Sequence, residues 1–224
     1  MSVRGLVSVG SLGLVLAGCS ADPDSIYFPP RADPVTARLA QTLHEAAFAA
    51  GDDPARYSFA LVSSSVPGAY SDDDATLYIT DGLLRMPAAV IDAVVAHEVA
   101  HEVLGHRGSR RALAMFLRAG FSVVGFVVPG AGLLDFVVNP IVVRAFSRQQ
   151  ELEADRKAVE ILRALGYTAP RRAMAEALVA IDKAGGATDE EPSGLLRALP
   201  PMDSRLSALE PLEAVPVARV LPRR

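Results

Sequence analysis

The chain has 224 residues, half of them hydrophobic, which is enough to bury one sizeable core and favours a single folded domain. Asp and Glu outnumber Lys and Arg by 26 to 22, which gives a formal net charge of -4. A chain with this balance offers no basic surface for a phosphate backbone. We therefore expect no nucleic acid among its partners.

The first nineteen residues are typical of an export signal. Arg4 precedes an apolar stretch over residues 6–16, and small residues follow. The stretch ends in the letters LAGC, which resemble the lipobox of bacterial lipoproteins and imply cleavage before Cys19 and acylation of that residue. The alternative is a buried or stray cysteine, but Cys19 is the only cysteine and stands where the lipobox requires it. Ser20, in place of Asp, implies sorting to the periplasmic face of the outer membrane.

This signal divides the chain into three parts. Residues 1–18 are the expected signal peptide. Residues 19–32 contain three prolines and no hydrophobic periodicity, so we interpret them as a lipidated tether. Residues 33–224 remain for one folded domain.

A helix is expected at the start of the domain. Asp33 is typical of an N-cap, Pro34 suits the first turn, and Gly51 suits the C-cap. The residues at helical spacing that would form its buried face are Val35, Leu39, Leu43 and Ala46. His44 lies beside that face without a neighbour at ligand spacing, so we assign it no metal role.

Two strands and further helices complete the expected architecture. Residues 57–62 and 76–80 are β-branched or aromatic runs that predict strands of a small sheet. Hydrophobic spacing and end signals predict helices over about residues 88–106, 147–165 and 170–183, and a short one from near residue 203. Ser147 and Gln150 would form a capping box at the start of the second of these, and Gly166 its C-cap. The fold class is therefore mainly α with a small β-sheet (α+β).

Residues 112–146 are the most hydrophobic segment after the signal. Pro129-Gly130 divides them into halves too short to span a bilayer separately, and Arg118, Asp135 and Pro140 interrupt them further. Three interpretations are open: a helical hairpin partly buried in the core, a hairpin whose tip touches the membrane, and a pair of spanning helices. We favour the first.

The stretch AHEVAHEVLGH, residues 96–106, carries the clearest chemical signal. His97 and His101 are four residues apart on one helix, so both imidazoles lie on the same side at a separation that one divalent cation can bridge. Glu98 follows the first histidine, which completes the pattern His-Glu-x-x-His. In that position Glu98 can take a proton from water that a metal has acidified and pass it to a leaving amine.

A third ligand is needed, and two segments could supply it. His106 lies five positions after His101, with Gly105 at the fourth, whereas the three-histidine motif of metzincins needs six and a glycine at the third. We therefore expect a helix-end role for His106 rather than a ligand role.

The better source is ELEAD, residues 151–155, on a second helix. Glu151 and Asp155 share a helical face, so one can bind the metal while the other orients a ligand histidine, and Glu153 points elsewhere. The alternative interpretation is that these residues form a solvated acidic face.

Together these motifs resemble the gluzincin metallopeptidases of the HtpX, BepA and LoiP kind, relatives of the CAAX prenyl proteases. That family places an apolar hairpin between a His-Glu-x-x-His helix and a Glu-x-x-x-Asp helix. The segments TLYITDGLLR (76–85) and LPPMDSRL (199–206) resemble further family segments, so the likeness covers about residues 35–210. It implies a zincin-like domain with its metal site between two helices.

The resemblance also implies residue roles. Carried over, it makes His97, His101 and Glu151 the ligands of one zinc ion, Glu98 the general base and Asp155 the partner of a ligand histidine. It places Arg205 near the active site. Where relatives have a histidine before two prolines this chain has Leu199, which leaves the stabilisation of the oxyanion unassigned.

The expected function is a lipid-anchored, zinc-dependent endopeptidase that acts on unfolded or misassembled proteins of the bacterial cell envelope. An extended substrate would pair with the edge of the small sheet near Leu77–Ile79. Two alternatives stay open: a metal-binding, chaperone-like lipoprotein that cleaves little, which Leu199 favours, and a structural lipoprotein without a metal, in which both motifs would be coincidental.

Overall fold

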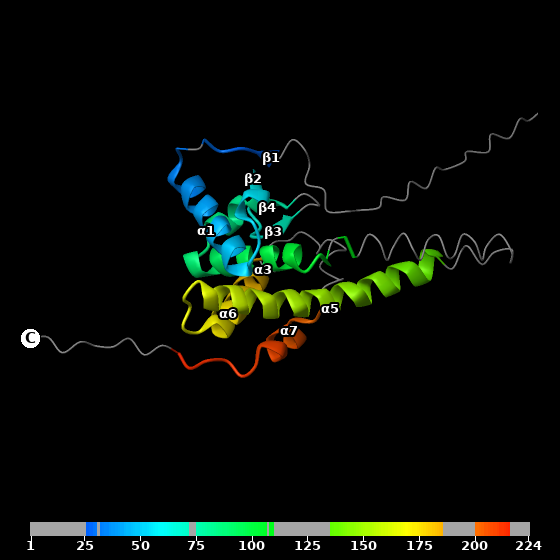
Figure 1. The fold of residues 1–224 in the computed structure, drawn as a ribbon. Coiled ribbons are helices and arrows are strands. Elements are labelled where there is room, and N and C mark those ends of the chain that lie inside the picture. The colour runs from blue at the N-terminus through cyan, green and yellow to red at the C-terminus, as the bar shows by residue number, and fades with distance from the viewer. Residues whose placement is uncertain are drawn as a thin grey trace, which may run out of the picture.

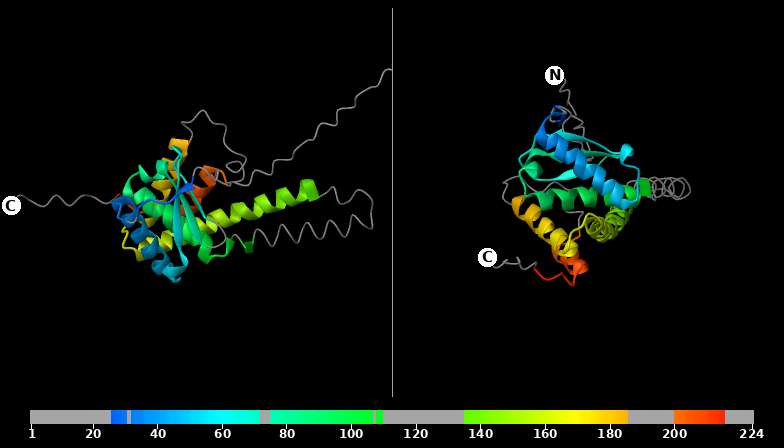
Figure 2. Two further views of the ribbon diagram at one scale, coloured as in Figure 1. Left: turned by 90° about the horizontal axis from the view of Figure 1, so that it is seen from above. Right: turned by 60° about the vertical axis from the view of Figure 1, so that its left-hand side comes forward.

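The computed structural model describes residues 26–30, 32–71, 75–106, 108–109, 135–185 and 200–215, with the backbone alone for residues 135–147. These residues are mostly helical and contain one four-stranded mixed sheet. The sheet lies on one side of helix α3 (Ala88–Val103), and helices α5, α6 and α7 lie on the other side (Figures 1 and 2). This confirms the predicted fold class.

Helix α1 (Pro34–Ala50) begins and ends as its sequence indicates. The Asp33 side chain accepts a hydrogen bond from the backbone N–H of Thr36, and Gly51 ends the helix in the left-handed conformation. Leu39, Leu43 and Ala46 are buried as expected. Val35 was wrongly included in that face, because it lies in the first turn and is 48% exposed.

The sheet contains the two predicted strands and two that were missed. Its strands are β1 (Ile26–Tyr27), β2 (Ser58–Val62), β3 (Ala69–Ser71) and β4 (Thr76–Thr80), in the order β1-β2-β4-β3. Strands β2 and β4 are parallel, and the two outer pairs are antiparallel. Strands β1 and β3 were missed because two or three residues are too few to show an alternating pattern. Ile26–Tyr27, assigned to the tether, thus belong to the sheet.

This strand order corrects the expected substrate edge. Strand β4 pairs with β2 on one side and β3 on the other, so Leu77–Ile79 have no free edge. The outer strands are β1 and β3. Leu77 and Ile79 point instead into the core, where both are fully buried.

Helix α3 is the central element of the fold. It packs against α1, α5, α6 and β3, and its buried residues lie on all sides of the helix rather than on one stripe. The central position of α3 therefore explains why the His-Glu-x-x-His motif near its end is withdrawn from solvent. A short helix, α2 (Asp81–Leu84), joins β4 to the segment before α3.

Helix α5 (Asp135–Ala164) is longer than predicted. It runs unbroken through Ser147 and Gln150, so the predicted capping box is wrong: neither residue lies at a helix start. It also continues across Pro140, which the sequence analysis treated as an interruption. The Gln150 side chain caps no helix and instead donates a 3.0 Å hydrogen bond to the backbone carbonyl of His106.

The remaining elements follow the prediction closely. Gly166, with a φ of 91°, ends α5, and helices α6 (Pro170–Gly185) and α7 (Met202–Leu209) lie where expected. Within the residues described, none of the helices combines the length and the apolar character needed to cross a membrane. Residues 1–25 and 110–134 lie outside the described part, as do the acidic segment 186–194 and Leu199.

Candidate metal centre

Helices α3 and α5 bring the three predicted ligands together. The Nε2 atoms of His97 and His101 are 3.1 Å apart, because one helical turn separates the two residues. The carboxylate of Glu151 on α5 lies across from both, 3.3 Å from the Nε2 of His97 and 3.4 Å from that of His101. The three side chains are buried, with 4% to 8% of each residue exposed.

This group suits a divalent metal ion. One ligand atom from each of the three residues lies within 4.8 Å of the other two, so a single ion could contact them all. Two imidazole nitrogens and one carboxylate oxygen form a donor set that zinc accepts, and three protein ligands leave a further position for water or substrate, as catalytic zinc sites require. The residues present therefore fit the zinc ion that the sequence predicts.

Charges around His97 favour a cation between the carboxylates. Burial alone would lower the pKa of His97, but the nearby carboxylates of Asp155 and Glu151 outweigh burial and raise this pKa to about 10. Burial also opposes ionisation of Glu151, yet His101 and His97 hold its pKa well below the ordinary value. A position that stabilises positive charge on His97 is also one where a metal cation would be stabilised.

Asp155 and Arg205 form the support behind His97. The Asp155 carboxylate lies 3.0 Å from the Nδ1 of His97 and accepts two hydrogen bonds from Arg205, of 2.8 Å from Nε and 2.6 Å from Nη2. Burial would raise the pKa of Asp155, but these contacts lower it, so the carboxylate stays charged. Arg205, which the resemblance places near the active site, comes from α7.

Glu98 points toward the sheet. The hydroxyl of Ser71, at the end of edge strand β3, donates a 3.1 Å hydrogen bond to its Oε2 atom. Both residues are buried. Ser71 lies in a polar connection where no motif marks it, so it could not be predicted from sequence. The contact depends on the packing of β3 against α3.

His106 lies on the far side of His101 from the ligand group. Its Nδ1 atom is 3.0 Å from the Nδ1 of His101, and its Nε2 is 3.4 Å from the Oε2 of Glu153. Gln150 donates a 3.0 Å hydrogen bond to the backbone carbonyl of His106. The helix-end role that was expected does not describe a side chain that is 3% exposed and stacked edge-on against a ligand candidate.

The structure describes six of the seven predicted site residues. His97, Glu98, His101, Glu151, Asp155 and Arg205 lie in one buried cluster built from α3, α5 and α7, and their roles remain predictions. Cys19 and Leu199 lie outside the described residues. His44 is exposed on α1.

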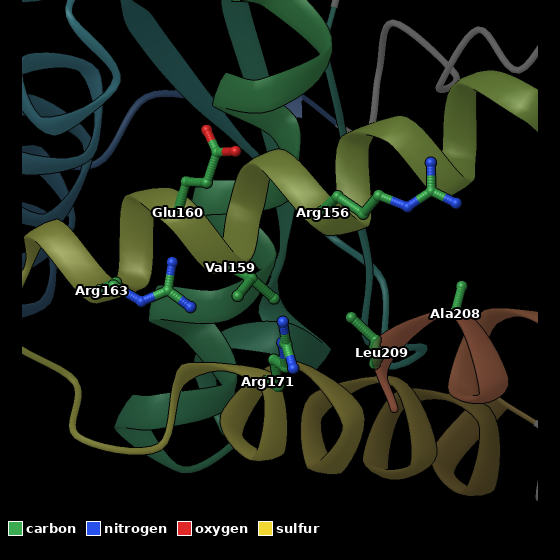
Figure 3. Close-up of a pocket in the computed structure, with 7 residues that line it drawn as sticks. All are labelled: Arg156, Val159, Glu160, Arg163, Arg171, Ala208 and Leu209. Atoms are coloured by element: carbon green, nitrogen blue, oxygen red, sulfur yellow. The ribbon is translucent and has the colours of Figure 1, made fainter. Parts of the chain in front are cut away.

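A separate hollow of about 300 Å³ lies between α5, α6 and α7 (Figure 3). Its lining includes three arginines together with Glu160, Val159, Ala208 and Leu209. None of the six clustered site residues lines it. The candidate centre is thus defined by convergent side chains rather than by this hollow.

A mainly helical domain with a buried His-His-Glu group between two helices is the arrangement of a zincin-like metallopeptidase. The family model described as peptidase family M48 matches residues 34–213, most of the chain. The protein belongs to this family, and we conclude that it is a metallopeptidase by family. No curated protein matches the chain.

Proposed function

We propose that the protein is a zinc-dependent endopeptidase of the HtpX, BepA and LoiP kind that hydrolyses unfolded or misassembled proteins of the cell envelope. The observation that carries this proposal is the buried group of His97, His101 and Glu151 with Glu98 beside it on the same helix. Zinc supplies a Lewis acid when bound there, which polarises a peptide carbonyl and acidifies water.

The chain's own residues divide the remaining work. The Glu98 carboxylate takes the proton from the attacking water and gives it to the nitrogen of the leaving amine. Ser71 keeps that carboxylate in place by donating to Oε2. Asp155, fixed by two hydrogen bonds from Arg205, holds the imidazole of His97 in orientation through its Nδ1.

An extended substrate would fit the edge of strand β3. This strand is outermost in the sheet and packs against α3, and its last residue, Ser71, contacts Glu98. A peptide that added to the sheet beside Ala69–Ser71 would therefore run past the general base. Pairing through the backbone accepts many sequences, which suits a protease that acts on unfolded chains.

The signal sequence supports a proposal for the place of action. We propose that acyl chains on Cys19 anchor the protein to the membrane, on the periplasmic face of the outer membrane, because LAGC matches a lipobox and Ser20 follows it. More than one acyl chain on the residue gives a stable anchor. A Cys19→Ser variant labelled with a palmitate analogue should carry no label, and labelling equal to the wild type would contradict the anchor.

Leu199 supports an alternative with little proteolysis. Relatives have a histidine at the corresponding position, and an apolar side chain cannot stabilise an oxyanion. In this alternative the protein binds zinc and holds unfolded clients as a chaperone or assembly factor.

The Glu98→Gln variant distinguishes the two functions. It keeps the shape of the side chain and can still accept the hydrogen bond from Ser71, but it removes the base. We expect a folded variant that binds about one zinc per chain, as the wild type does, and digests casein at least roughly a hundredfold more slowly. Zinc-dependent cleavage at equal rates would contradict the role of Glu98. Zinc binding without measurable cleavage by either protein would favour the chaperone.

A further inference from the structure

His106 is buried against His101, although its position in the sequence does not predict this contact. Helix α3 ends at Val103, and Gly105 then adopts a φ of 63°, which reverses the direction of the chain. This turn brings His106 back so that its ring meets that of His101 edge-on, with centroids 5.0 Å apart. On a continuing helix, a residue five positions later would point to a different side.

Helix α5 holds His106 at two points that flank the ligand Glu151. Gln150, 2% exposed, donates to the backbone carbonyl of His106, and Glu153 faces the Nε2 atom of its ring. Gln149 in turn donates a 2.9 Å hydrogen bond to Glu153. The orientation of the ring is thus fixed by the same helix that supplies the carboxylate of the metal group.

The contact between the two rings has one polarity that is compatible with a metal. His101 directs Nε2 toward His97 and Glu151, so in a metal-binding imidazole the proton must lie on Nδ1. That N–H then donates to the Nδ1 of His106, which must be unprotonated. The reverse polarity would place the proton of His101 on Nε2, where it would block the ion.

Glu153 favours the required polarity. Its carboxylate, which can only accept, lies 3.4 Å from the Nε2 of His106 and so favours a proton on that atom. With the proton there, the Nδ1 of His106 is left as the acceptor. His101 therefore donates to His106, and His106 donates to Glu153.

We propose that His106 is a positioning residue for the metal site, which sets the tautomer and the ring orientation of His101 by accepting its Nδ1–H. This inference rests on the proposed zinc function and names a residue that supports one of the ligands. In other metal sites, replacing a partner of this kind lowers metal affinity roughly 10- to 100-fold.

Three substitutions at His106 test the inference. The amide oxygen of Asn can occupy the place of Nδ1, that of Gln reaches the place of Nε2, and Ala offers neither. We expect zinc affinity, measured by competition with a chromophoric chelator, to fall roughly 10- to 100-fold in His106→Ala and His106→Gln and to recover largely in His106→Asn. His44→Ala is the matched control. It removes an exposed histidine on α1 and should bind zinc as the wild type does.

Thermal unfolding without zinc separates positioning from packing. A packing role alone would lower the melting temperature of all three His106 variants and would leave Asn no better than Gln in zinc affinity, which would overturn the proposal. Affinities for His106→Ala equal to the wild type would also overturn it. If the wild type itself binds no zinc, the proposed function fails first and this inference with it.

Discussion

His97 and His101 lie one turn apart on α3, yet their supports differ. Behind His97 stands Asp155, a fully buried carboxylate that accepts two hydrogen bonds from Arg205. Behind His101 stands the ring of His106, and beyond it Glu153, whose side chain is 43% exposed. The first support is an ion pair buried in the core. The second is a series of side-chain contacts that extends from the core to the solvent.

The two supports should contribute differently to the stability of the fold and to the orientation of the site. A buried charge that loses its partner is strongly destabilising, so the His97 side should link the metal centre to the stability of the whole fold. On the His101 side the outer carboxylate, that of Glu153, is 43% exposed, so water and salt screen its charge. Substitutions there should affect metal binding more than folding.

The Asp155→Asn variant should give the largest effect. It keeps the volume but removes the charge directly opposite Arg205, so the buried guanidinium keeps only the more distant carboxylate of Glu151, 3.9 Å from its Nη2. We expect the free energy of unfolding to fall by about 3–5 kcal/mol, measured by urea denaturation without zinc. A loss below about 1 kcal/mol would show that the two supports do not differ in this way.

The same variant has a testable dependence on pH. Contacts with Arg205 and His97 outweigh burial and lower the pKa of Asp155 in the folded protein. A carboxylate with a lowered pKa stabilises the fold at pH values above its unfolded pKa of about 3.9, and this contribution is lost as the pH falls through the folded pKa. The difference in stability between wild type and Asp155→Asn should therefore be full at neutral pH and shrink below about pH 4.

The two supports also differ in how far the sequence could predict them. Helical spacing places His97 with His101, and Glu151 with Asp155, on common helical faces, and the family resemblance then implied that Glu151 is the ligand and Asp155 the support. The position of His106 depends on the left-handed turn at Gly105, and a glycine in a sequence does not reveal its φ.

Tertiary contacts explain the other differences from the prediction. Ser71 reaches Glu98 only because β3 packs against α3, and three residues carry no periodic signal for that strand. The capping box at Ser147 was a valid local pattern, but α5 begins twelve residues earlier, at Asp135, so the pattern marks no helix start. Local sequence predicted the elements well, whereas pairing order and long-range contacts needed the fold.

Gly105→Ala should give an intermediate effect. A Cβ atom there would meet no atom within 4 Å, so the expected penalty comes from the backbone conformation alone. The left-handed region costs an L-residue roughly 1–2 kcal/mol, and relief of this strain would move His106 away from His101. Urea denaturation and zinc competition measure the two consequences. Gly68→Ala is the control, since that position also has room for a Cβ and lacks a positive φ; equal effects of both variants would contradict the role of the turn.

Glu153→Gln should change stability least, and it is the direct counterpart of Asp155→Asn. Both substitutions replace a carboxylate that faces a histidine by its amide, but the Glu153 side chain is 43% exposed, whereas Asp155 is fully buried against Arg205. Its amide oxygen can still accept the Nε2–H of His106, so the polarity of the chain from His101 is retained. We expect the free energy of unfolding to change by less than about 1 kcal/mol and this change to shrink further at high salt, because exposed charges are screened. Denaturation at low and high ionic strength, with zinc competition in parallel, measures it. A loss of stability as large as that of Asp155→Asn would mean that Glu153 is held in the core as tightly as Asp155, and the proposed contrast between the two sides of the metal centre would be wrong.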